Sequence, residues 1–181
     1  MFPFIRQSIR SDYCAVYATA MYLSLLGCQT DRRQALHLFG AKRGAPWRGA
    51  THIDMLAVIR RCLPDYNARW LRTARSSSAV RRSFQAIAAR GSPALVTAYC
   101  RHRSSGVECG HAFLVTGFQE DRFLLLDPLG RPPSKADQYN TSTVAKSARD
   151  GLDLWPVEGS AWDLIPARGA GVLQCADLAR D

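Results

Sequence analysis

The chain has 181 residues and is 47% hydrophobic, which is enough apolar material for one domain with a buried core. No apolar run reaches the roughly 18 residues that a membrane-spanning helix needs, so we expect no membrane span. The net charge is +9, but only three of the 24 basic residues are lysines, and the arginines are scattered along the chain. We therefore interpret them as solvated helix faces and expect no nucleic-acid partner.

The N-terminal part of the sequence has helical patterns. Asp12 or Ser11 can cap a helix from Tyr13 to Leu26, and Gly27 can end it. The elements expected next are helices over 31–39 and from 51 to just before Pro64, a loop over 40–51, a short strand over 67–73 and an amphipathic helix over 79–90.

Strand patterns follow in the second half. We expect a strand over 94–99, an exposed turn over 101–106, and a hairpin whose strands cover 111–118 and 123–127. Residues 131–150 are polar and loop-like, and two short apolar pieces at 152–155 and 162–165 are expected to dock on the body. Helices followed by an antiparallel sheet predict an α+β fold.

Six cysteines occur at positions 14, 28, 62, 100, 109 and 175. None forms a Cys-x-x-Cys pair, so zinc-ribbon and thioredoxin motifs are excluded, and we expect neither a metal nor another cofactor. Dependence on a free thiol fits a reducing compartment. We therefore expect a cytoplasmic protein. The alternative is a protein that is secreted or delivered as an effector.

Cys14 is the candidate nucleophile. It lies just after the expected start of the first helix, where the helix dipole favours the thiolate. A neighbouring imidazolium would favour the thiolate further and would then serve as the general acid for the leaving group.

His111 and Asp127 are the candidate base and its orienting carboxylate. They lie on the two strands of the expected hairpin. If the hairpin is centred on Gln119 or Glu120, both odd-numbered residues point to the same face. A carboxylate beside an imidazole fixes its tautomer and stabilises the imidazolium, but a slip of one residue would separate the two side chains.

Gln7 is the candidate oxyanion donor, because a side-chain amide upstream of the nucleophile can act beside the Cys14 backbone N–H. Each of these residues alone has an ordinary structural interpretation as a packing cysteine, a strand histidine or a turn aspartate. Their occurrence together, in this order and on these elements, favours a catalytic triad.

The chain resembles the papain-like cysteine peptidase superfamily, and within it the C39-like peptidases, which include bacteriocin-processing domains. The resemblance covers about residues 6–130 and consists of Gln7 and Cys14 before an apolar helix, the segment 49–56, the segment 91–96, the strand 111–118 and the segment 127–130. It implies Cys14 as nucleophile, His111 as base and acid, Asp127 as orienter and Gln7 as oxyanion donor. It also implies an N-terminal helical part whose nucleophile helix packs on an antiparallel sheet.

The sequence departs from the family pattern beside the nucleophile. Tyr13 and Ala15 flank Cys14 where the family has Asp and Gly, and the spacing to Gln7 is one residue longer. We expect a C39-like catalytic domain over residues 1–130 and a C-terminal extension, 131–181, that has no counterpart in the family and packs on the same domain.

The expected substrate is a peptide or protein. It would lie in a groove between the nucleophile helix and the sheet, bordered by the loops 40–51 and 101–110. Trp47, His52 and Gly110 are the candidate substrate-binding residues. Two alternatives stay open: a papain-fold acyltransferase or deamidase resembling a toxin or effector, and a peptide-binding module without turnover. The sequence does not reveal the oligomeric state.

Overall fold

The computed structural model describes residues 4–5, 12–41, 49–73, 76–90, 93–102, 106, 108–119, 122–128, 142–143, 155–156, 162–164 and 170–177. Its helices are α1 (Cys14–Leu25), α2 (Arg32–Leu38), α3 (His52–Cys62) and α4 (Ser77–Ala89). Each lies within two residues of a helix expected from the sequence. None of these helices is long and apolar enough to cross a membrane.

Local capping explains where α2 and α3 begin. At α2, the Asp31 side chain accepts a hydrogen bond from the Gln34 backbone N–H, and the Gln34 side chain accepts one from the Asp31 backbone. At α3, Thr51 and Asp54 form the same reciprocal pair. Each of these reciprocal pairs is a capping box, which supplies acceptors for backbone N–H groups that have none at the start of a helix. Both helix starts are therefore set by the local sequence.

The strands form one antiparallel sheet. They are β1 (Tyr66–Arg72), β2 (Ala94–His102), β3 (Glu108–Gln119), β4 (Arg122–Leu126), β5 (Ser142–Thr143), β6 (Trp155–Pro156), β7 (Trp162–Leu164) and β8 (Ala170–Asp177). The main order is β1-β8-β2-β3-β4-β5, and β7 pairs with the end of β2 and with β6. The α+β expectation from the sequence is confirmed.

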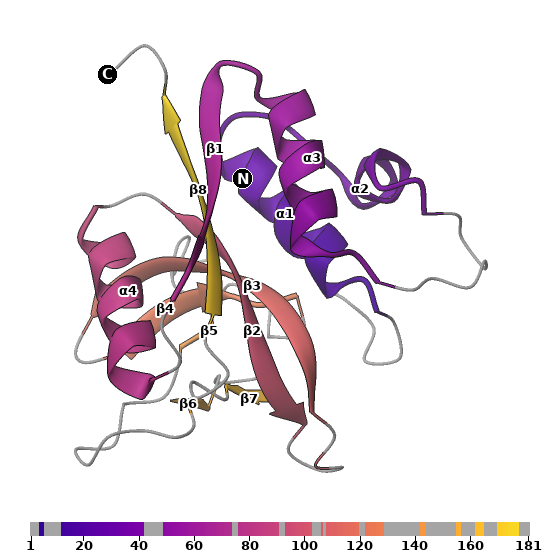
Figure 1. Ribbon diagram of the computed structural model, residues 1–181. Coiled ribbons are helices and arrows are strands. Elements are labelled where there is room, and N and C mark those ends of the chain that lie inside the picture. The colour runs from indigo at the N-terminus through magenta and orange to yellow at the C-terminus, as the bar shows by residue number, and fades with distance from the viewer. Residues whose placement is uncertain are drawn as a thin grey trace.

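Strand β8 was not predicted. It lies between β1 and β2 and pairs with both, so the last described segment of the chain is an inner strand of the sheet (Figure 1). At Gly171 the chain has no room for a side chain, because a Cβ there would collide with the Trp70 indole. The glycine therefore lets β1 and β8 pair while Trp70 lies across β8.

Helices cover both faces of the sheet, with α1 and α3 on one side and α4 on the other (Figure 1). The residues of β3 alternate between the two cores. Ala112 and Leu114 pack in the cluster that contains α1, and Phe113 and Val115 pack in the cluster that contains α4. The apolar helix α1 is buried from Ala15 to Leu23. Its N-terminus, which carries Cys14, is thereby held against the sheet.

Candidate active site

Cys14 is the first residue of α1. The N-cap is Tyr13, and its side chain does not cap the helix. The expectation that Asp12 or Ser11 caps this helix is therefore wrong for Asp12, and Ser11 lies outside the described residues. Tyr13 has φ −97° and ψ 14°, and its carbonyl accepts the first helical hydrogen bond from Tyr17. Tyr13 therefore adds no side-chain acceptor for the N–H groups of the first turn.

The surroundings of Cys14 favour its thiolate. Burial opposes ionisation, but a hydrogen bond and the charge from His111, followed by the backbone N–H groups of Ala112 and Ala15, outweigh it. The pKa of the Cys14 thiol consequently lies below its ordinary value. Two stabilising influences thus coincide at this sulfur: an imidazole partner and backbone donors, one from the helix and one from β3.

A β-bulge sets the register that His111 and Asp127 need. Near the turn, Gln119 pairs with Arg122, and continuing that register would place Asp127 opposite an even-numbered residue of β3. The register shifts between Val115 and Gly117, after which Leu114 pairs with Leu126. Because of this extra residue, Asp127 falls opposite the odd-numbered Phe113 and on the same face of the sheet as His111, as the sequence predicts.

His111 and Asp127 meet as a result. The Nε2 atom of His111 lies 2.8 Å from Oδ1 of Asp127, and both side chains are almost fully buried, at 4% and 0% exposure. Burial alone would lower the pKa of His111, but the charge and hydrogen bond of Asp127, helped by Cys14, raise it to about 10. The imidazolium is therefore the favoured form over most of the pH range.

The two ring nitrogens of His111 have different partners. Because Nε2 faces Asp127, the interaction with Cys14 falls to Nδ1. The carboxylate thus orients the ring so that its other nitrogen meets the sulfur. This arrangement can hold a thiolate–imidazolium pair, deliver a proton from Nδ1 to a leaving group, and take one back from water.

Of the four remaining predicted residues, the structure describes His52 and Gly110. Gln7 and Trp47 lie outside the described residues. The exposed His52 ring stacks on Trp70, with 5.1 Å between ring centroids and 23° between planes. Gly110 is exposed on β3 beside His111, and no described atom lies within 4 Å of where its Cβ would be. This open side lies on the strand face opposite to the His111 side chain, because successive residues of a strand point to opposite faces.

Two features of the site were missed by sequence reasoning. The backbone N–H of Ala112 is one, since a main-chain donor leaves no trace in side-chain patterns. The bulge at Thr116 is the other, and Gly117 was its available signal, because an isolated glycine within a strand pattern often marks a bulge. Among the described residues, no three His, Cys, Asp or Glu side chains cluster in a way that could hold a metal ion.

Comparisons with known proteins agree on the fold. No family model and no curated protein sequence matches the chain. Among solved structures, a candidate C39-like peptidase from Bacillus anthracis is similar over 97% of this chain and 96% of its own, with a TM-score of 0.56 and 16% identity. The peptidase domain of Streptococcus ComA, a bifunctional ABC transporter involved in a quorum-sensing pathway, is similar over 97% and 98%, with a TM-score of 0.54 and 12% identity.

UfSP from C. elegans is similar over 97% of this chain but only 32% of its own, with a TM-score of 0.50 and 15% identity. At these identities the similarities establish the fold alone. The chain has the papain-like α+β fold of C39-like peptidase domains.

Proposed function

We propose that the protein is a cysteine peptidase that cleaves an amide bond in a peptide or protein substrate. The observation that carries the proposal is the buried contact of His111 with Asp127, beside a Cys14 thiol whose pKa is lowered by the same histidine. Neighbours with the same fold are described as peptidases, which supports this chemistry. A purely structural histidine would not need a carboxylate on one nitrogen and a thiol on the other.

In the first half of the reaction, the Cys14 sulfur attacks the carbonyl carbon of the scissile amide and forms a C–S bond. The negative charge that develops on the carbonyl oxygen is stabilised by the Cys14 backbone N–H and the Gln7 side-chain amide. His111 gives its Nδ1 proton to the amide nitrogen, the C–N bond breaks, and the amine leaves. A thioester remains on Cys14.

In the second half, neutral His111 takes a proton from water at the same nitrogen. The oxygen of that water attacks the thioester carbonyl, the C–S bond breaks, and the acid product leaves. The sulfur departs as a thiolate, and the proton held by His111 restores the starting ion pair. Asp127 stays ionised throughout and keeps the ring oriented.

An acyltransferase or deamidase would form a thioester on Cys14 as well and would differ in the substrate amide or in the acceptor that releases the acyl group. We favour peptide hydrolysis because the two neighbours that share the fold over nearly their whole length are described as peptidases. A binding module would have no use for the low thiol pKa of Cys14, and this pKa argues against that alternative.

The experiment that tests the function is digestion of a proteome-derived peptide library in H₂¹⁸O, read by mass spectrometry, with Cys14→Ala as the control. Hydrolysis predicts new C-termini that carry one ¹⁸O atom and are absent with the variant. Deamidated glutamine or new amide cross-links without chain cleavage would instead assign the second activity. Identical spectra for wild type and Cys14→Ala would reject both.

A further inference from the structure

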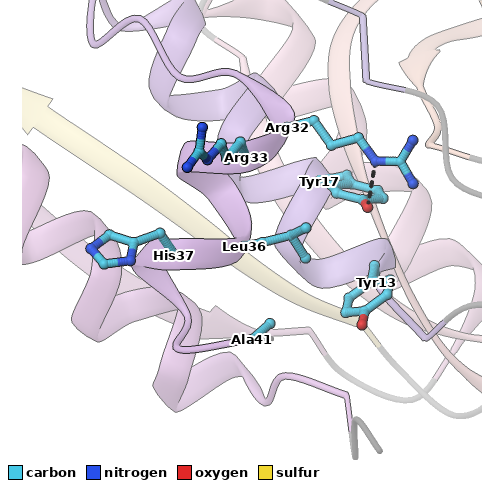
Figure 2. Close-up of a pocket in the computed structure, with 7 residues that line it drawn as sticks. All are labelled: Tyr13, Tyr17, Arg32, Arg33, Leu36, His37 and Ala41. Atoms are coloured by element: carbon cyan, nitrogen blue, oxygen red, sulfur yellow. Dashed lines mark hydrogen bonds between the residues drawn. The ribbon is translucent and has the colours of Figure 1, made fainter. Parts of the chain in front are cut away.

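A cavity of about 730 Å³ lies between α1 and α2, next to the start of the nucleophile helix. Its described lining includes Tyr13, Tyr17, Arg32, Arg33 and Leu36 (Figure 2). The volume falls in the range of sites that hold small ligands or a few peptide residues. Because Tyr13 directly precedes Cys14, the cavity begins beside the proposed active site without containing any residue of the triad.

Arg32 is held in this cavity by a fixed partner. Its Nε donates to the Tyr17 hydroxyl at 2.9 Å, and its guanidinium carbon lies 5.4 Å from the centroid of the Tyr17 ring. Tyr17 is fully buried, so the hydroxyl that receives this bond is fixed in the packed helix. Figure 2 shows the guanidinium group extending beyond that hydroxyl. With Nε engaged, the two terminal nitrogens form a pre-oriented fork, which matches a carboxylate.

The cavity also carries excess positive charge. Arg33 and His37 lie on the neighbouring face of α2 (Figure 2), and none of the described lining residues is acidic. Within the described part of the chain, the ion pairs are Arg101–Glu108 and His111–Asp127. Neither of them involves Arg32 or Arg33. The charge is thus available to an external anion.

We propose that this cavity binds an acidic segment of the peptide substrate, with Arg32 as the bidentate partner of a carboxylate and Tyr17 as the positioning residue of Arg32. The proposal rests on the peptidase function and adds a substrate preference to it. The half-buried Tyr13 ring supplies an apolar wall for the same segment, and it lies 5.7 Å from the buried Tyr17 ring that positions Arg32. Tyr13 also directly precedes Cys14, so the segment would lie next to the residue that carries the nucleophile.

The test uses the Cys14→Ala protein, so that binding is measured without turnover. The probes are two fluorescein-labelled peptides that are identical except at three consecutive positions, which are Glu in one peptide and Gln in the other. Their binding is measured by fluorescence anisotropy at low salt. The Glu peptide should bind about tenfold more tightly than the Gln peptide. Adding Arg32→Gln should remove about tenfold in affinity, and Arg32→Lys and Tyr17→Phe should each cost several-fold, because charge without the oriented fork is insufficient.

Arg82→Gln is the matched control. Arg82 is an exposed arginine of α4, on the opposite side of the sheet, so the same charge is lost far from the cavity. It should leave the affinity for the Glu peptide unchanged. Equal affinity for the Glu and Gln peptides, or an equal loss in Arg82→Gln and Arg32→Gln, would overturn the proposal. Tighter binding of a dT12 oligonucleotide with the same dependence on Arg32 would also overturn it, in favour of a nucleic-acid site.

The two proposals can fail separately. Binding of the Glu peptide by Cys14→Ala requires no hydrolysis, so loss of the peptidase proposal would leave an acidic-peptide site in place. Conversely, peptide cleavage could depend on Cys14, be unchanged by Arg32→Lys and show no enrichment of acidic residues near the cut. That result would reject the acidic-peptide site and retain the peptidase proposal. Circular dichroism of Arg32→Lys checks that the variant is folded.

Discussion

Replacing Asp127 by Asn removes the charge of a buried carboxylate while keeping its size. The pKa of His111 stands at about 10, although burial alone would lower it, and Asp127 is the largest of the opposing causes. An opposite charge in hydrogen-bond contact commonly shifts a pKa by about 1–3 units. We therefore expect the pKa of His111 to fall by about 2 units in Asp127→Asn, which corresponds to about 3 kcal/mol less stabilisation of the imidazolium.

The loss should pass on to Cys14. Because the imidazolium of Asp127→Asn should deprotonate about 2 units lower in pH than that of the wild type, the thiolate has a charged partner over a narrower pH range, and the pKa of the Cys14 thiol should rise towards its ordinary value. Turnover should fall roughly 10²–10⁴-fold, because the pair is less often in its reactive form and the ring is less well oriented. The decrease should be smaller than that in Cys14→Ala, which has no nucleophile.

The assay is an NMR titration of ¹⁵N-histidine-labelled protein from pH 5 to 11, with His111→Gln to assign the resonance. Wild-type His111 should remain an imidazolium to near pH 10, and the variant should titrate about 2 units lower. A wild-type His111 that titrates below pH 7, or one that Asp127→Asn leaves unchanged, would refute this reasoning.

Three further changes address other parts of the site. Deletion of Thr116 removes the extra residue of the bulge but leaves the pairs Gly117–Leu124 and Val115–Leu125 in place, so His111 should keep its contact with Asp127; slow alkylation of Cys14 at pH 5 in this protein would contradict the register argument. Gln7→Ala should lower kcat by about 10²–10³-fold, and near-normal kcat would assign Gln7 to structure. In the Cys14→Ala background, Asp127 still raises the pKa of His111, so the stabilisation of the fold by His111 is complete below about pH 6.5 and is lost as the pH rises through that raised pKa. Urea unfolding should show the free-energy difference between Cys14→Ala and Cys14→Ala/His111→Gln shrinking over that range, whereas a constant difference would rule this out.

Local signals accounted for much of the fold. The starts of α2 and α3 follow from capping residues within one helical turn, and both were predictable for that reason. The hairpin was predictable because its strands are adjacent in sequence and each is bounded by turn residues. The match of His111 with Asp127 did not follow from the hairpin alone, because the register at the turn would put the two side chains on opposite faces, and the unpredicted bulge at Thr116 restores the match.

Features that depend on distant parts of the chain were not predictable in this way. Strand β8 pairs with β1 and β2, which lie far upstream, and its own sequence from Ala170 to Asp177 has no clean alternation of apolar and polar residues. The cap of α1 was misassigned because Asp12 is a strong capping residue, yet packing of the apolar helix on the sheet places the N-cap at Tyr13. The cavity beside Arg32 joins two helices and was likewise invisible in the sequence.

The most direct measurement of the central claim is the alkylation rate of each cysteine by iodoacetamide from pH 4 to 9, read by mass spectrometry, in wild type and His111→Ala. The thiolate–imidazolium pair predicts that Cys14 reacts fast at low pH, well ahead of Cys28 or Cys175, and that this advantage disappears without His111. A Cys14 that reacts no faster than those two thiols, or equally fast in His111→Ala, would contradict the account.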